Sequence, residues 1–302
     1  MKTITVRANG DSWANPEQVK EQLATVHPLE PVCFDTGAEG ISLSHSGILD
    51  FIDQWASATG HLQDQIVINS PNVYEKTQYQ NINHADNHFL QLSGHYKTEV
   101  PNIDPTSSKF GFFVGRHTDI RNQIAVDVIK HYSNHFVMSV MKTSYTVSPW
   151  SELVRNIPSI DDLYVRDQYF GSIDTNLSLL QHYHRFQIEL VAETMCSGIT
   201  FFPTEKTFRP ITGRRPFLVF GPVNFLNNLQ QLGFKTYHSC WDESYDQLEG
   251  QDRWRAVRLI IDNIVSNGYD IEQAQQIADY NQQHLTRWHA LTMPKNMPRV
   301  IK

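Results

Sequence analysis

The chain has 302 residues, of which 40% are hydrophobic and 19% are charged, as in an ordinary globular protein. This length is enough for two Rossmann-like halves or one large domain. The net charge of -7 argues against tight, non-specific binding of nucleic acid, although it is compatible with a local basic surface.

Three cysteines are scattered along the chain without a C-x-x-C pair, at Cys33, Cys196 and Cys240. We therefore expect neither a disulfide framework nor a zinc cage. The N-terminal M-K-T-I-T-V-R is typical of a strand and not of a signal peptide, and no run of about 18 apolar residues occurs. These features predict a cytoplasmic protein with no membrane partner.

Strands and helices are predicted to alternate along the first part of the chain. Strands are predicted at residues 3–6, 31–34 and 65–68, and helices at 15–25 and 48–57. This β/α alternation indicates a parallel sheet. The polar residues 81–108, with two prolines, are the best linker candidate.

The second part of the chain continues the alternation. Strands are predicted at residues 110–114, 136–140, 186–192 and 216–220, with a helix after the first of them. Residues 150–181 are acidic and loop-rich. Two amphipathic helices, at 253–267 and 271–291, close the chain.

The most informative stretch runs from residue 186 to 246. It contains F-F-P-T-E-K-T-F-R-P-I, G-R-R-P-F-L-V-F-G, G-F-K-T and W-D-E-S-Y-D. Thr204 is placed to cap a short helix between two strands. A polar turn and a helix start after a parallel strand are typical of nucleotide sites, because helix N-termini there favour phosphate.

These motifs resemble a known family. T-E-K, followed by a short helix and G-x-x-P-F-L-V-F-G, resembles the donor-binding motif of the fucosyltransferase-like glycosyltransferases. The wider pattern E-T-x-x-x-G-x-x-F-F-x-T-E-K-T-x-R-P-I is similar to glycosyltransferase-like proteins of phages and giant viruses, over residues 110–268. The resemblance implies an α/β enzyme of the GT-B type, with two Rossmann-like halves and a cleft between them. It also implies a nucleotide-sugar donor bound without a metal.

The resemblance leads to three predicted regions. Residues 1–100 form an acceptor-side half, residues 101–270 a nucleotide-sugar-binding half, and residues 271–302 a C-terminal helix that crosses back to the first half. The expected reaction moves a sugar from a nucleoside-diphosphate sugar, which is a co-substrate, to a hydroxyl, and no cofactor is expected. One base and a stabilised leaving group suffice for inversion, which we therefore favour.

Two acceptor classes stay open. One is a glycan or small molecule, and the other is a hydroxymethylated base in DNA, as in phage DNA modification. The viral lookalikes favour DNA, whereas the net charge of -7 favours the first class. A non-catalytic nucleotide-sugar-binding or structural protein is the alternative to an enzyme.

Fixed cations can stabilise a departing diphosphate in place of a metal. The candidates are Lys206, Arg209, Arg116 and Arg121. Glu205 and Glu193, with Thr204, are the polar donor-site candidates, and Glu205 is suited to accept hydrogen bonds from sugar or ribose hydroxyls. The alternative for Glu205 and Lys206 is a surface ion pair at a helix start, and for Glu193 a structural carboxylate at a strand end.

Glu39 is the candidate general base. It lies in D-T-G-A-E-G after a predicted strand of the first half, and a carboxylate or imidazole has to take the proton of the acceptor hydroxyl. Asp35 and His45 are the next candidates, and Asn72 and Glu75 are placed on the acceptor side. A glycine-rich turn without catalytic function is the alternative for residues 35–40.

Other chemistries have weaker support in the sequence. There is no D-x-D motif of the kind that a metal-dependent GT-A enzyme would need. His182 and His184 are better explained as a strand edge than as metal ligands. G-x-G-x-x-G and P-loop motifs are missing as well, so a dinucleotide or P-loop site is not predicted.

Overall fold

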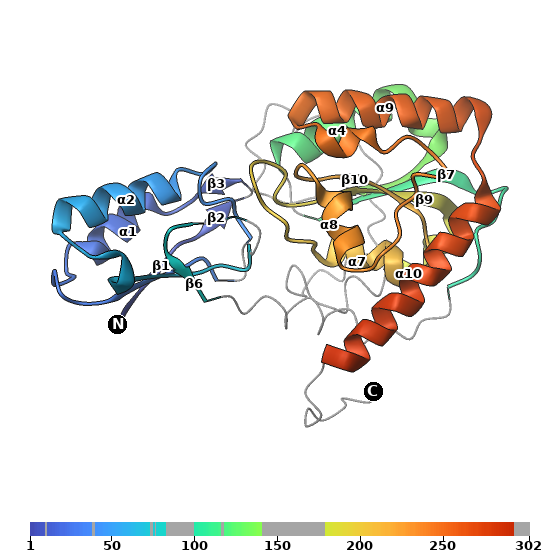
Figure 1. Ribbon diagram of the computed structural model, residues 1–302. Coiled ribbons are helices and arrows are strands. Elements are labelled where there is room, and N and C mark those ends of the chain that lie inside the picture. The colour runs from blue at the N-terminus through green and yellow to red at the C-terminus, as the bar shows by residue number, and fades with distance from the viewer. Residues whose placement is uncertain are drawn as a thin grey trace. The chain divides into compact units, whose positions relative to one another are not determined.

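The computed structural model describes residues 1–9, 11–37, 40–72, 75, 77–82, 100–115, 118–140 and 179–292 (Figure 1). Its strands are β1 (Lys2–Thr5), β2 (Ala8–Asn9), β3 (Ser12–Trp13), β4 (Val32–Asp35), β5 (Ile66–Asn69), β6 (Gln80–Asn81), β7 (Ser108–Val114), β8 (Phe136–Val140), β9 (Phe186–Ala192) and β10 (Phe217–Phe220). Its α-helices are α1 (Pro16–Leu23), α2 (Ile48–Thr59), α4 (Asp119–Tyr132), α7 (Glu205–Thr212), α8 (Phe225–Gln231), α9 (Gly250–Asn267) and α10 (Ile271–Thr292).

The described residues form two compact units, and neither is continuous in sequence. Unit 1 takes the described residues of 1–89, together with 194–202 and 221–225, and unit 2 takes the others. Both short segments lie inside the predicted second half of the chain. The tail that we expected to cross back begins with α10, which belongs to unit 2.

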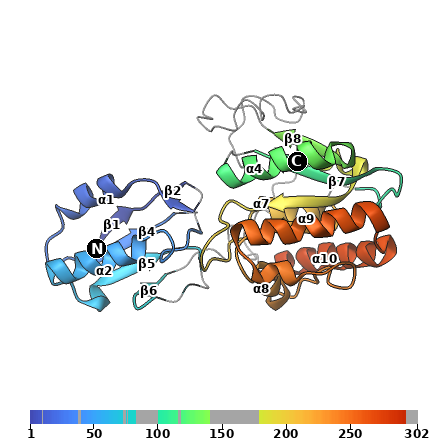
Figure 2. The ribbon, with the colours of Figure 1, turned by 90° about the horizontal axis from the view of Figure 1, so that it is seen from above.

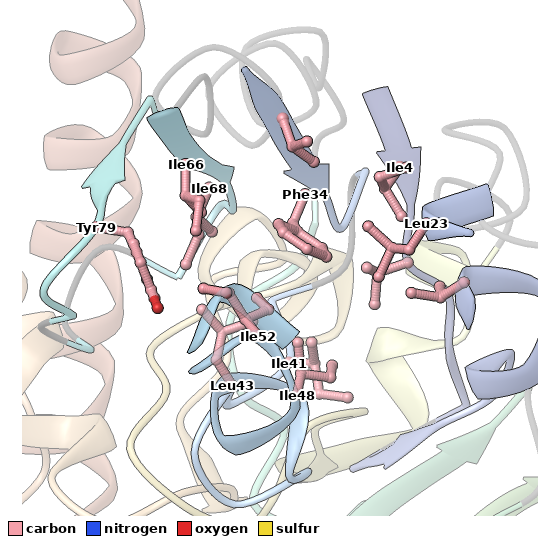
Figure 3. Close-up of a cluster of buried hydrophobic side chains, with 14 of the residues drawn as sticks. Ile4, Leu23, Phe34, Ile41, Leu43, Ile48, Ile52, Ile66, Ile68 and Tyr79 are labelled. Carbon is pink, nitrogen blue, oxygen red and sulfur yellow. The ribbon is translucent and has the colours of Figure 1, made fainter. Parts of the chain in front are cut away.

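Unit 1 contains a four-stranded parallel sheet in the order β1-β4-β5-β6. The chain advances through this sheet in one direction, with α1 after β1 and α2 after β4. Right-handed crossovers of that kind place successive helices on the same face of the sheet. Figure 3 shows the resulting core between the strands and α2.

The core of unit 1 is made by alternate strand residues and one face of each helix. Ile4, Phe34 and Ile68 are at most 1% exposed, and they pack with Ile52 of α2 (Figure 3). The helix ends at Gly60, whose left-handed φ of 74° lets its N–H bond to the carbonyl of Ala56.

Unit 2 contains the second four-stranded parallel sheet, in the order β10-β9-β7-β8. The chain runs from β7 outward to β8, and then returns to the other side of β7 for β9 and β10. Because the direction reverses, α4 and α7 cover opposite faces of the sheet (Figures 1 and 2). The predicted α/β class with parallel sheets is confirmed in both units.

Two further helices complete the layers of unit 2. Trp254 of α9 donates its Nε1 hydrogen to Asp127 of α4, at 2.7 Å, so α9 lies beside α4. On the opposite face α10 packs against α7 (Figure 1). Asn281 of α10 exchanges two hydrogen bonds of 2.8 Å with the backbone of Lys235.

The W-D-E-S-Y-D motif has a structural role. Asp246 accepts hydrogen bonds from the backbone N–H groups of Leu226 and Asn227, at 3.0 and 3.1 Å, at the start of α8. The fully buried guanidinium of Arg253 lies 3.1 Å from the same carboxylate. This motif therefore fixes α8 and α9 to each other and is explained without a ligand.

Candidate functional site

The strand order of unit 2 reverses at its central strand. β8 lies on one side of β7 and β9 on the other, although β8 comes before β9 in the chain. In open α/β sheets, ligands bind outside the carboxyl ends of the two strands at such a reversal. In unit 1 the described strands follow chain order instead. The candidate site of unit 2 therefore lies at the carboxyl ends of β7 and β9.

Glu193, directly after β9, fixes the start of α7. Its side chain accepts hydrogen bonds from the backbone N–H of Thr204 (3.0 Å) and from the hydroxyls of Thr204 (2.5 Å) and Thr207 (2.6 Å). Glu193 is only 1% exposed. This predicted donor-binding residue is therefore buried, and its hydrogen bonds join the end of β9 to the start of α7.

Thr204 is the N-cap of α7, as predicted. Its hydroxyl accepts a hydrogen bond from the backbone N–H of Lys206 at 3.2 Å, while it donates to Glu193. The residue is 4% exposed. Its oxygen is thus used to orient the first turn, which is the turn that carries Glu205 and Lys206.

The first turn of α7 keeps two charged side chains in contact with solvent. Lys206 is 15% and Glu205 is 22% exposed, and the Nζ of the lysine lies 2.5 Å from the carboxylate. The rest of the helix, from Thr207 onward, is buried. A helix N-terminus also favours negative charge, because its backbone N–H groups point outward. The backbone N–H groups of residues 206–208 already bond to Thr204, so an anionic group that reaches this turn would meet the ammonium of Lys206 and the dipole of the helix.

We expect Glu205 to stay ionised far into acid. Burial would raise the pKa of its carboxyl, but the charge and hydrogen bond of Lys206 lower that pKa from 4.5 to about 2. Because the folded-state pKa is lowered, the contribution of the ion pair to stability is present above pH 4.5. It is lost as the pH falls from 4.5 to about 2.

A carbon-detected NMR titration of the glutamate carboxyls measures this pKa. In the Lys206→Ala variant the midpoint of Glu205 should move back toward 4.5. A midpoint near 4.5 in the unchanged protein would show that the two side chains are not paired in solution.

Arg121 lies at the strand reversal, but its side chain is buried and bonds to the backbone of unit 2. It is 1% exposed, and its Nε and Nη2 donate to the carbonyl of Ala192 at 3.1 and 2.9 Å. The side chain thereby ties the first turn of α4 to the end of β9. The sequence predicted that Arg121 lies close to a strand end, but it did not predict that the side chain is buried.

Arg209 lies in the interior of unit 2. It is 5% exposed and forms an ion pair with Glu189 of β9, which is fully buried. Its Nε lies 3.2 Å from the hydroxyl of Tyr183, which in turn donates to Glu189. Burial raises the pKa of the Glu189 carboxyl, and the charge of Arg209 opposes that rise. The structure does not bring Arg209 to the exposed turn of Lys206.

Two predicted site residues, Glu39 and Arg116, lie outside the described residues. Their neighbours are described. Gly115 directly follows β7, and Thr118 caps α4 by accepting from the backbone N–H of Arg121 at 3.4 Å. The segment that holds Arg116 thus joins the carboxyl end of β7 to the start of α4.

Asp35 lies at the carboxyl edge of the unit 1 sheet, as the last residue of β4. Its Oδ1 accepts from the N–H of Gly37 at 2.8 Å and from the amide of Asn69 at 3.0 Å. Asn69 ends the neighbouring strand β5 and is aligned with Asp35 in register. The carboxylate is half-buried and stays in contact with solvent.

Glu75 and Asn72 organise the loop before α2. The Glu75 carboxylate, 6% exposed, accepts from the backbone N–H groups of Leu43 (2.5 Å) and Ser44 (2.8 Å) and from the hydroxyl of Ser42 (3.1 Å). Asn72 donates to Glu75 at 3.2 Å and to the carbonyl of Ile199 at 2.8 Å. The structure brings these two predicted acceptor-side residues together, and it gives both of them structural hydrogen bonds.

His45 is exposed and lies beside a residue that sequence reasoning missed, Asp11. Asp11 accepts from the backbone N–H groups of Cys196 and Ser197, at 2.9 and 3.1 Å, and so holds the 194–202 segment on unit 1. Burial raises the pKa of Asp11, whereas those N–H groups and nearby His45 lower it. The only signal in the sequence was an Asp in the short N-G-D-S turn after the first strand.

Glycine is required where the 194–202 segment passes His45. Gly198 has a φ of 73°, and a Cβ there would lie 2.5 Å from the Cβ of His45 and 2.6 Å from the Oγ of Ser42. Any larger residue would clash and would strain the backbone. The G of the E-T-x-x-x-G motif is therefore explained by close packing within unit 1.

No model of a known protein family and no curated protein sequence matches this chain. Within the described ranges, no cluster of three or more His, Cys, Asp or Glu side chains is arranged to hold a metal ion. In the same part of the chain, no helix has both the length and the apolar character needed to cross a membrane.

Proposed function

We propose that the protein is a glycosyltransferase of the GT-B type, which takes a nucleoside-diphosphate sugar without a metal and transfers the sugar to a hydroxyl. Unit 2 binds the donor, and unit 1 provides the acceptor-side residues. The observation that carries the proposal is the partly exposed pair of Glu205 and Lys206 at the start of α7. This helix follows β9, one of the two strands at the reversal of the unit 2 sheet.

Several features support a donor diphosphate at this place. The dipole at the helix start and the ammonium of Lys206 both favour negative charge, and a diphosphate would compete with Glu205 for that ammonium. The turn is held by the buried Glu193 and Thr204, so its geometry is fixed before a ligand arrives. Fixed donors of this kind stabilise developing charge better than mobile ones, because they need no reorganisation during the reaction. Arg116, which follows β7, is the second cation that we assign to the diphosphate.

In the proposed reaction, one bond to the anomeric carbon forms while another breaks, and one proton is transferred. A base removes the proton of the acceptor hydroxyl, and the oxygen attacks the anomeric carbon of the sugar. The bond from that carbon to the diphosphate breaks, and the diphosphate leaves with the electron pair. Lys206 stabilises this leaving group, while Glu205 holds the ammonium in place and is available to sugar or ribose hydroxyls.

On the acceptor side, Glu39 is the proposed base, since it follows the strand end at Asp35. Asp35 and exposed His45 are the next candidates. Glu75 and Asn72 position the loop that carries His45, through the hydrogen bonds described above. The acceptor is a glycan or small molecule, or a hydroxymethylated base in DNA, and transfer proceeds with inversion at the anomeric carbon.

A thermal-shift screen of nucleotide sugars tests donor binding. A ligand at 100 times its dissociation constant stabilises the folded state by about 2.7 kcal/mol, so a true donor should raise the melting temperature clearly. We expect a shift with one nucleoside-diphosphate sugar and with the matching nucleoside diphosphate, in the presence of EDTA. If no nucleotide sugar shifts the melting temperature, the proposed function is wrong.

A further inference from the structure

A pocket lies in unit 2, at the opposite end of the sheet strands from the candidate donor site. It has a volume of about 700 Å³, which is in the range of small-molecule sites, roughly 300–1,000 Å³. Asn102 precedes β7, and Arg214 precedes β10, so the pocket is at the amino ends of the strands. Its polar lining consists of Asn102, Thr212, Arg214, Asp279, Gln282 and Gln283.

Arg214 is held rigidly in this pocket. Its Nε lies 2.7 Å from Asp279, and its Nη2 donates to the side-chain oxygen of Asn102 at 2.9 Å. Its φ of 51° is a left-handed conformation, which is unfavourable for a residue other than glycine. The surrounding contacts thus keep the guanidinium in one place, and 32% of the side chain remains exposed for a ligand.

Thr212 gives a second and independent sign of a ligand. It lines the pocket and is 6% exposed, yet its hydroxyl has no hydrogen-bond partner among the described residues. A buried hydroxyl without a partner destabilises the folded protein. The hydroxyl oxygen is itself buried, so a ligand hydroxyl would supply the missing hydrogen bond once the side chain of Thr212 turns its oxygen toward the pocket.

The charges of the lining indicate a neutral ligand. The guanidinium of Arg214 is balanced by the carboxylate of Asp279, and the other polar groups are amides and a hydroxyl. The fully buried guanidinium of Arg215 lies behind the lining, bonded to the carbonyls of Pro101 and Asn102, so the side chains that line the pocket carry no net charge. Amides and hydroxyls both donate and accept hydrogen bonds, which suits a ligand with many hydroxyl groups. We propose that this pocket binds a neutral carbohydrate, at a site separate from the donor site and independent of whether the protein transfers sugars.

Saturation-transfer NMR of the full chain with methyl glycosides of glucose, galactose, mannose and fucose tests this inference. We expect at least one glycoside to bind the unchanged protein. Thr212→Val and Gln282→Leu should each weaken that binding about tenfold, which corresponds to about 1.4 kcal/mol. Thr212→Val should fold normally, because it keeps the shape of the side chain and removes a hydroxyl that has no hydrogen-bond partner among the described residues.

Two controls make the outcome specific. Gln276 is an exposed glutamine of α10, the helix that also carries Gln282, and it does not line the pocket. The Gln276→Leu variant should therefore bind the glycoside like the unchanged protein. Lys206→Ala should also bind the glycoside normally, since it alters only the proposed donor site. The inference is overturned if no glycoside binds, if both pocket variants bind as tightly as the unchanged protein, or if inorganic phosphate displaces the bound glycoside.

Discussion

Replacing Lys206 with alanine should slow sugar transfer by about 100- to 1,000-fold, because the leaving diphosphate loses its positioned cation. The estimate of about 2.7–4 kcal/mol comes from the loss of single transition-state donors in other enzymes. The variant should lose some stability but stay folded, since the pair with Glu205 is only 15% and 22% exposed, yet the carboxylate keeps contact with solvent when its partner is removed. Initial rates with saturating donor, together with an unfolding curve, measure both quantities.

Lys130→Ala is the matched control for this experiment. Lys130 is an exposed lysine in the last turn of α4, far along the helix from its start at the strand reversal, and its loss should leave the rate unchanged. An unfolded Lys206→Ala variant would show that the lysine is structural. Wild-type turnover in that variant would show that the exposed turn of α7 does not hold the leaving group.

The second large effect is expected in stability and not in catalysis. Arg209→Met should lower the free energy of unfolding by about 3–5 kcal/mol, because it leaves the buried carboxylate of Glu189 without its cation. Tyr183 would remain as the main hydrogen-bond donor to that carboxylate. Urea unfolding followed by fluorescence measures the loss.

A double variant separates this explanation from a role in donor binding. Glu189→Met combined with Arg209→Met removes both charges, and apolar residues of similar size often replace a buried ion pair at little cost. We therefore expect the double variant to regain most of the lost stability. If Arg209→Met is as stable as the unchanged protein but loses donor affinity, Arg209 belongs to the donor site and the buried pair has been misinterpreted.

The periodicity of the sequence predicted the elements of the fold well. The alternation of Phe186, Ile188 and Leu190 with polar residues indicated β9, and the structure has a strand there. The alternation did not predict burial on both sides of that strand. Gln187 and Glu189 are both fully buried: Glu189 pairs with Arg209, and the Gln187 amide N–H groups donate to the carbonyls of Pro105 and Ser107, partners that are distant in sequence.

The cations show why a site is harder to predict than a strand. Lys206, Arg209 and Arg121 are all close in sequence to strand ends or helix starts, and each was therefore a candidate for the diphosphate. Burial separates them, since the two arginines are at most 5% exposed while Lys206 keeps contact with solvent. A single sequence records the type of each residue but not its internal partners.

The return of residues 194–202 to unit 1 could not be foreseen either. The contacts that hold this segment come from Asp11, Gly40 and Asn72, all more than a hundred residues earlier in the chain. The sequence showed a glycine-containing link between a strand and the T-E-K helix. Only the close packing of Gly198 against His45 gives that glycine its physical reason.

The most direct test of the account is the release of nucleoside diphosphate from the donor that the thermal-shift screen identifies, followed by phosphorus NMR in excess EDTA. We expect the unchanged protein to release nucleoside diphosphate at the same rate with and without the chelator, and the Lys206→Ala variant to release it about 100- to 1,000-fold more slowly. Donor binding without any release would contradict the proposed enzyme. Release that stops in EDTA and returns with manganese would contradict the assignment of the leaving group to Lys206 and the start of α7.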